Sequence, residues 1–200
     1  MKKVFLSLLA LATFGFANAQ SREKETIEIT PTVGSSSSLI YGDNTDNYID
    51  MPGVRFGVTA DYYFNSRWSI RTGIINESMG ARELDFKYKL NYVTVPINAN
   101  WHFGSTRKWN LNFGLTPSIL TSAKEDNYFI NEHNNDIKYA FNSFQLGLTY
   151  GIGYKIEISE KFGILIDFQG FNGLTNINSK GRYYNQNAVS SFNLGGVFKL

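Results

Sequence analysis

The stretch GVRFGVTADYYF, residues 53–64, alternates between two kinds of side chain without interruption. One set is apolar or aromatic throughout and consists of Val54, Phe56, Val58, Ala60, Tyr62 and Phe64. Apart from Tyr63, the other set is polar or glycine, and it includes Arg55 and Asp61. A period of two is typical of a β-strand with two unlike faces. The stretch therefore predicts a strand with apolar surroundings on one side and polar surroundings on the other.

Seven further stretches repeat this period of two. They cover residues 26–33, 68–75, 92–103, 109–119, 144–156, 162–169 and 191–200. In each stretch one face is mainly bulky and apolar, and the other is mainly polar or glycine. Together with residues 53–64 they predict eight strands, an even number that suits an up-and-down barrel.

The connections between these strands alternate in length. Short segments at residues 65–67, 104–108 and 157–161 have the length of hairpin turns. Longer polar segments lie at residues 42–51, about 76–90, 123–140 and 178–187. Short turns at one end and long loops at the other are typical of outer-membrane barrels, whose periplasmic turns are the short ones.

The apolar face decides between two all-β folds. A soluble β-sandwich also alternates, because one face of each sheet is buried, and it is the main alternative. Aromatic residues, however, gather at the short-turn ends, as membrane-interface belts do; they are Tyr62, Phe64, Trp68, Trp101, Phe103, Trp109, Tyr154, Phe162 and Phe198. We therefore expect an eight-stranded antiparallel up-and-down transmembrane β-barrel with short periplasmic turns and long extracellular loops.

The first residues predict export. Residues 1–19 combine Lys2 and Lys3, an apolar stretch at 4–16 and the small residues Ala17-Asn18-Ala19, which is the layout of a secretory signal peptide. A membrane anchor is the alternative, but the apolar stretch is shorter than the ~20 residues that a helix needs to span a bilayer. The expected division is a signal peptide at 1–19 and a barrel domain at 20–200, located in the Gram-negative outer membrane.

Composition excludes several classes of protein. The chain has 19 Lys and Arg against 17 Asp and Glu, so its net charge of +2 provides no basic stripe for nucleic acid. It has no cysteine, so no disulfide can stabilise it. After the first twenty residues no uncharged apolar run is long enough for a transmembrane helix.

The polar face predicts a filled lumen. Eight strands enclose an interior just wide enough for side chains, so we expect a polar core. With a turn at 65–67, paired residue numbers sum to 132, so we expect Asp61 opposite Arg71 and Arg55 opposite Glu77 on adjacent strands, both pairs pointing inward. Glu28 and Lys199 lie near the short-turn ends of the first and last strands, and we expect a similar contact between them at the barrel closure. Lys155 and Asp167 add to this cluster. Because enclosed charges are costly unless paired, we expect a structural plug; a gated ion path or proton relay is the alternative.

No motif indicates catalysis, a cofactor or a metal. His102 faces inward opposite Asn110 with no activated serine evident, and His133 lies in a loop whose carboxylates fit no ligand spacing. We therefore expect no catalytic, cofactor-binding or metal-binding residues and no enzyme activity. Loop aromatics are expected to anchor the membrane interface or to form a binding surface; they are Tyr41, Tyr48, Tyr88, Tyr128, Phe129, Tyr139, Tyr183 and Tyr184.

Four segments resemble the PorT-like outer-membrane β-barrel family. They are LNYVTVPINANWHF (90–103), WNLNFGLTPSILTSAK (109–124), FNSFQLGLTYGIGYKI (141–156) and FNGLTNI (171–177). Where family members often carry an Asp before the sixth strand, this chain has Asn142 and Ser143. The resemblance implies an eight-stranded barrel without known catalytic residues, and some relatives assist protein secretion.

The expected function is structural or interactive, through the extracellular loops, with an accessory role in protein secretion as one form of it. A narrow porin-like pore and, after it, a lipid-modifying enzyme are the alternatives. The expected partners are outer-membrane lipid, lipopolysaccharide and a protein at the loops. No nucleic acid is expected to bind, and the chain is expected to be a monomer.

Overall fold

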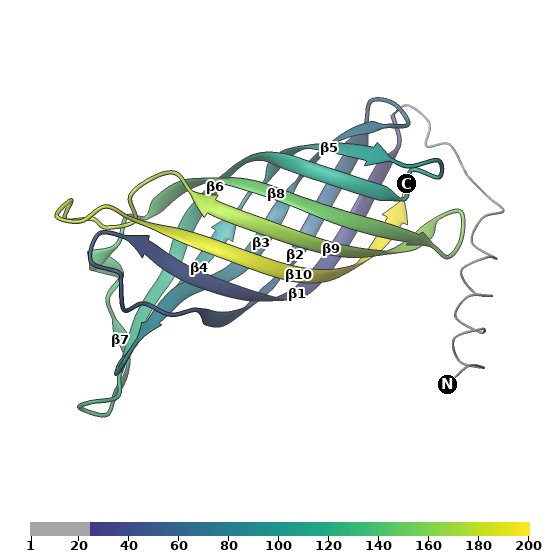
Figure 1. Ribbon diagram of the computed structural model, residues 1–200. Helices are drawn as coiled ribbons and strands as arrows, with labels where there is room; N and C mark the ends of the chain where they lie inside the picture. Colours follow the sequence, from purple (N-terminus) through teal and green to yellow (C-terminus); the bar gives the residue numbers. More distant parts are fainter. Residues whose placement is uncertain (1–24) are drawn as a thin grey trace.

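The computed structural model describes residues 25–200, which form ten β-strands and one 3₁₀ helix (Figure 1). The strands are β1 (Ile27–Gly42), β2 (Met51–Tyr63), β3 (Trp68–Glu83), β4 (Phe86–Thr94), β5 (Ile97–Phe103), β6 (Trp109–Asn127), β7 (Glu132–Asp136), β8 (Phe144–Glu157), β9 (Phe162–Gly173) and β10 (Asn185–Lys199), and the 3₁₀ helix covers Lys138–Ala140. The predicted signal peptide at 1–19 lies outside the described residues. Within residues 25–200, no helix has the length and apolar character to cross a membrane.

The strands pair in antiparallel order around one closed ring. β4 and β5 occupy a single position, because both pair with β3 and β6 and only Val95 and Pro96 separate them. β10 pairs with β1 and closes the ring, whereas β7 pairs only with β6. With β7 left out and β4 and β5 counted once, the ten described strands give eight positions, which confirms the predicted barrel.

The register between β2 and β3 agrees with the predicted register. Arg55 lies opposite Glu77 and Asp61 lies opposite Arg71 across β2 and β3. His102 lies opposite Asn110 across β5 and β6, also as predicted. A slip of one residue would move the charged face outward, so strict alternation and a short turn are enough to set this register.

The apolar face points outward. Val54 and Phe56 are 54% and 53% exposed, whereas Arg55 between them is 8% exposed and Asp61 is 2% exposed. A soluble sandwich would bury the apolar face instead, so the sandwich alternative is wrong. Closure pairs every strand, as a hydrocarbon environment requires, because lipid offers no partner to backbone N–H and C=O groups.

Aromatic rings line the outside of the short-turn end. Consecutive ring contacts join Trp68 to Trp101 at 6.3 Å, Trp101 to Phe103 at 5.1 Å, Phe103 to Trp109 at 6.2 Å, and Trp109 to Tyr154 at 4.8 Å. Tryptophan and tyrosine favour the membrane–water interface, where one part of the ring is apolar and the other wet. This aromatic row therefore marks the periplasmic interface of the barrel.

Two of the predicted loops are largely strand. The segment at about 76–90 continues β3 to Glu83 and enters β4 at Phe86, and the segment at 123–140 contains the end of β6, the whole of β7 and the 3₁₀ helix. Polar residues remain in strands here because neighbouring strands satisfy the backbone, as the register between Arg82 and Lys87 shows. On this side the sheet extends beyond the rest of the barrel (Figure 1).

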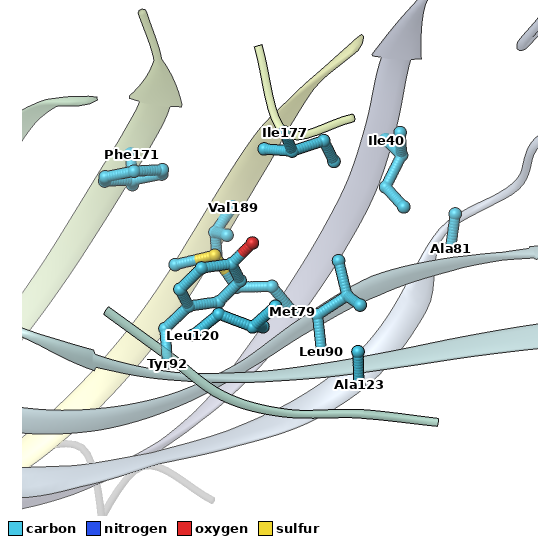
Figure 2. Packing of buried hydrophobic residues seen from close by; sticks show 10 residues of the cluster. All are labelled: Ile40, Met79, Ala81, Leu90, Tyr92, Leu120, Ala123, Phe171, Ile177 and Val189. Carbon is cyan, nitrogen blue, oxygen red and sulfur yellow. The ribbon is translucent and has the colours of Figure 1, made fainter. Parts of the chain in front are cut away.

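The lumen is not polar along its whole length. An apolar cluster fills the end that faces the long connections (Figure 2); it consists of Ile40, Met79, Ala81, Leu90, Tyr92, Leu120, Ala123, Phe171, Ile177 and Val189. The expectation of a polar core is therefore wrong for the outer half. The reason is that inward positions beyond the membrane can bury apolar side chains in an ordinary hydrophobic core, shielded from water by the strands around them.

Candidate functional site: the closed lumen and its outer rim

The inner half of the lumen holds the predicted charges in ion pairs. Arg55 Nη1 lies 2.8 Å from Glu77 Oε1, and Arg71 Nε lies 3.0 Å from Asp61 Oδ2. Arg71 Nη1 also lies 3.8 Å from Asp167 Oδ2, so one guanidinium faces two carboxylates. All five side chains are buried. Pairing offsets the cost of enclosing these charges, and the pairs join β2, β3 and β9 across the interior.

Glu28 is paired with a lysine other than the predicted one. Lys199 is its register partner across β1 and β10, but the ion pair forms with Lys155 on β8. Tyr63 Oη donates a second hydrogen bond to Glu28 Oε2 at 2.8 Å, and Lys155 Nζ lies 3.3 Å from Tyr63 Oη. Lys155 reaches Glu28 because both side chains are buried in the lumen, whereas Lys199 is the last residue of β10 and is only half-buried.

His102 lies next to a serine that also contacts an aspartate, but the direction of the hydrogen bonds among the three does not suit nucleophilic catalysis. Ser69 Oγ donates to Asp61 Oδ1 at 2.9 Å and lies 3.0 Å from His102 Nε2. Since the only hydroxyl proton of Ser69 points to Asp61, His102 Nε2 must carry a hydrogen and donate to the serine oxygen. A catalytic histidine accepts the serine proton and is oriented by the carboxylate, which is the reverse arrangement.

His133 lies far from this cluster, on exposed strand β7. Its ring contacts that of Tyr128 at a centroid distance of 5.3 Å. Within residues 25–200, no three His, Cys, Asp or Glu side chains are placed to hold a metal ion together. The structure thus separates the two histidines.

A small cavity lies beside the ion pairs. Its lining includes Arg55, Arg71, Asp167, Asn98 and Asn193, and water centres can occupy about 20 Å³ of it. That space fits one or two water molecules and no larger solute. The side-chain oxygens of Asn98 and Asn193 have no protein hydrogen-bond partner among the described residues, so water is the occupant that suits the cavity.

The β9–β10 loop covers the apolar cluster on the side of the long connections. Ile177, in the connection between β9 and β10, is fully buried in the cluster (Figure 2). Asn142, just before β8, donates from Nδ2 to the carbonyl oxygens of Asn176 at 2.9 Å and Asn178 at 3.0 Å. The Asn142 backbone N–H also donates to Ile177 O at 2.7 Å. We call these three hydrogen bonds the Asn142 latch, because they hold Ile177 over the barrel mouth.

Sequence reasoning did not identify the Asn142 latch. Two of the segments quoted for the family resemblance, 141–156 and 171–177, contain Asn142, Asn176 and Ile177, and Asn178 follows the second segment directly. The first segment begins directly after the predicted loop at 123–140, and the second ends directly before the predicted loop at 178–187. This position beside two loops is the signal that the sequence offers. The choice of Asn is explained by chemistry: an amide donates two hydrogen bonds to carbonyls, whereas a carboxylate only accepts them.

The loop aromatics divide into half-buried and exposed groups. Tyr48 and Tyr88 contact each other at 5.7 Å and pack against the apolar cluster. Tyr41 Oη donates to Gly173 O at 3.2 Å and ties β1 to β9. The rings at the outer rim are exposed: Tyr128, Phe129, Tyr139, Tyr183 and Tyr184. The exposed group is the part of the predicted surface that remains available to a partner.

Comparisons with known proteins agree with this architecture. A family model described as outer membrane protein beta-barrel domain matches residues 18–179. The chain is similar to the crystal structure of Neisserial surface protein A, with 13% identity, a TM-score of 0.51, and coverage of 86% of this chain and 97% of that chain. It is also similar to outer membrane protein AlkL in lipid bilayers, with 7% identity, a TM-score of 0.51, and coverage of 92% and 95%.

A third similar structure is Ail, the attachment invasion locus protein of Yersinia pestis, with 15% identity, a TM-score of 0.49, and coverage of 88% of this chain and 99% of that chain. No curated protein sequence matches the chain. At such low identities, Neisserial surface protein A and AlkL indicate a shared fold and nothing further.

Proposed function

The chain belongs to the outer membrane protein beta-barrel domain family, and from this premise we propose that it is a closed barrel that binds a partner through its extracellular loops. It is an integral β-barrel protein of the Gram-negative outer membrane. The observation that carries the proposal is the occupied lumen. Buried ion pairs fill the inner half and the apolar cluster fills the outer half.

A pore would require a continuous wet path through both halves. The cavity beside Arg71 has room for one or two waters, and Tyr92, Met79 and Ile177 lie fully buried beyond it. Moving an ion through this apolar layer would cost far more than moving it through water. The geometry therefore favours an interaction role over the narrow porin-like pore.

The hydrogen-bond polarity at His102 likewise favours binding over catalysis. A lipid-modifying enzyme would need a serine that donates to the histidine, and Ser69 donates to Asp61 instead. We therefore propose that the protein is not an enzyme, and that its role is structural or interactive. The resemblance to the PorT-like family would make the loop partner a component of protein secretion.

The surroundings of the barrel follow from its outward face. Exposed apolar side chains such as Phe56, Phe113 and Ile119 contact outer-membrane lipid. We propose that lipopolysaccharide surrounds the extracellular ends of the strands. The ring that the eight strand positions form in residues 25–200 is closed and leaves no free edge within the membrane, which supports a monomer. Residues 1–19 are proposed to act as the signal peptide that exports the chain.

Two measurements on the mature chain test the proposal. In planar lipid bilayers we expect no single-channel steps, and discrete conductance would overturn the closed barrel. In affinity capture from detergent-solubilised outer membranes, we expect a partner with intact loops and its loss when at least one of the connections at 43–50, 84–85, 128–131 or 174–184 is shortened. Capture that is equal for every loop variant would overturn the loop-dependent role.

A further inference from the structure

Two extracellular hairpins end side by side in one tip. The β3–β4 hairpin turns at Leu84 and Asp85, and the β6–β7 hairpin turns at residues 128–131. The Tyr128 backbone N–H donates to Asp85 O at 2.8 Å and joins the two turns. We call Leu84, Asp85, Tyr128, Phe129 and Ile130 the paired hairpin tip. It lies on the part of the sheet that projects furthest on the β7 side in Figure 1.

The paired hairpin tip lies in water, well outside the membrane. A transmembrane strand uses about 9–11 residues, so β6, which begins at Trp109 in the periplasmic aromatic row, has left the hydrocarbon near Leu120. Eight more residues of tilted strand carry Tyr128 about 20 Å beyond that level. Contact with the acyl chains around the barrel cannot therefore account for the apolar side chains of the tip.

The apolar side chains of the tip are unusually exposed. Leu84 is 91% exposed, Phe129 is 81% exposed, and Tyr128 and Ile130 are each 54% exposed. Hairpin turns in water are normally built from Gly, Asn, Asp and Ser, which cost nothing to expose. A cluster of four large apolar side chains at two adjoining turns instead indicates a surface that a partner covers.

The tip is held in shape without being covered. Asn127 Oδ1 accepts hydrogen bonds from the backbone N–H groups of Phe129 at 3.1 Å and Ile130 at 3.4 Å. Asp126 Oδ1 accepts a hydrogen bond from the Asn134 N–H at 2.9 Å, and Asp126 Oδ2 pairs with Lys89 on β4. A surface that is already ordered loses little conformational entropy on binding, which is the property of an efficient anchor.

Acidic residues adjoin the apolar side chains. Glu83 and Asp85 flank Leu84, and Glu132 follows the second turn. None of these three carboxylates forms an ion pair with another residue in 25–200, and Glu132 Oε2 accepts a hydrogen bond from Asn135 Nδ2 at 2.9 Å. The basic residues nearest the β3–β4 turn, Arg82 and Lys87, form the cross-strand pair one step further from the turn, and Arg82 Nε donates to Asp50 O. The phosphate groups of a lipopolysaccharide surface are negatively charged and would repel the three carboxylates. These carboxylates instead complement a partner whose binding site is lined by Lys or Arg.

We infer that the paired hairpin tip docks into an apolar pocket with a basic rim on a protein partner outside the cell. Phe129 and Leu84 supply the buried anchors, and Glu83, Asp85 and Glu132 face the cationic rim. The inference rests on the proposed loop-dependent function, because it names the loop surface and the chemistry of the partner. It does not depend on whether the lumen conducts ions.

The test places a photo-reactive phenylalanine analogue at position 129 of the full chain in intact cells, with position 183 as the matched control. Tyr183 is also an exposed aromatic of the rim, but it lies in the β9–β10 loop. We expect a crosslinked protein adduct at 129 and none at 183. The adduct protein, purified, should then bind the barrel in lipid nanodiscs about tenfold or more weakly with Phe129→Ser or Leu84→Ser. Tyr183→Ser should leave the affinity unchanged.

The contribution of the three carboxylates to binding can be measured separately. Replacement of the three flanking carboxylates, as E83Q, D85N and E132Q together, should weaken binding and reduce its salt dependence. Adducts to lipopolysaccharide or to a second copy of the chain, equal adducts at 129 and 183, or no adduct at all would each overturn the inference. If the tip variants bind normally while shortening another loop abolishes binding, the inference fails and the proposed function stands.

Discussion

Lys155 on β8 contacts Glu28 on β1, although 127 positions separate them and their strands are not neighbours in the ring. The contact therefore crosses the lumen. With Tyr63 Oη as a second donor to the same carboxylate, it ties three strands together at the periplasmic end.

Replacing Lys155 with Met should destabilise the barrel by about 3–5 kcal/mol, because the buried Glu28 carboxylate would lose the Lys155 ammonium that faces it. Unfolding in urea from lipid vesicles measures the change. The control is Lys199→Met, which removes the register partner of Glu28 but not its ion-pair partner. Equal losses for the two variants would show that the cross-lumen tie is not the stabilising contact.

Removing Arg71 tests whether the ion pairs act as a plug or as a path. Arg71→Ala leaves Asp61 without its guanidinium and Asp167 without its nearest cation, so a loss of about 3–5 kcal/mol is expected. Exposed Arg82→Ala is the control and should cost about 1 kcal/mol or less. A variant that stays as stable as the wild type and begins to conduct in planar bilayers would contradict the structural role.

Asn142→Asp should open the Asn142 latch, because a carboxylate cannot donate to Asn176 O and Asn178 O. Hydrogen exchange in residues 174–184 should become faster. Asn65→Asp is the matched control, since Asn65 Oδ1 only accepts hydrogen bonds from the backbone N–H groups of Arg67 and Trp68. Unchanged exchange in the β9–β10 loop of the Asn142 variant would refute the latch.

The β6–β7 hairpin should loosen in acid. The hydrogen bond from Lys89, then the Asn134 N–H and the nearby positive charge, hold the pKa of Asp126 below its ordinary value. A carboxyl whose folded pKa is lowered stabilises the fold above its unfolded pKa, about 4, and loses that contribution as pH falls through the folded pKa. The protection of the Asn134 N–H, taken relative to its intrinsic exchange rate at each pH, should therefore fall below about pH 4. Asp126→Asn should remove this pH dependence, and a variant that keeps it would disprove the assignment.

A charge on the outward face should be costly only within the hydrocarbon. Phe113→Arg, near the middle of the spanning part of β6, should destabilise the barrel by about 2–4 kcal/mol. Phe129→Arg, at the paired hairpin tip in water, should change its stability little. Similar effects of both substitutions on vesicle-based unfolding would argue against the membrane position assigned to β6.

The sequence alone determined the features that depend on local alternation. A period of two places Arg55 and Asp61 inside and Phe56 outside, and the short turn after Phe64 sets the β2–β3 register, so the ion pairs with Glu77 and Arg71 could be predicted. Hairpin partners are close along the chain, and a slip of one residue would turn charged side chains into lipid. The number of strand positions and the membrane environment follow from the same pattern.

Only the tertiary structure decided which residues meet across the interior. Glu28 pairs with Lys155 rather than Lys199, Ile177 from a loop completes the apolar cluster, and two turns meet at Tyr128 and Asp85. These contacts depend on strand tilt, ring closure and strand extension beyond the membrane. The alternation of apolar and polar residues states which face a side chain occupies, but it carries no information on what lies across the lumen.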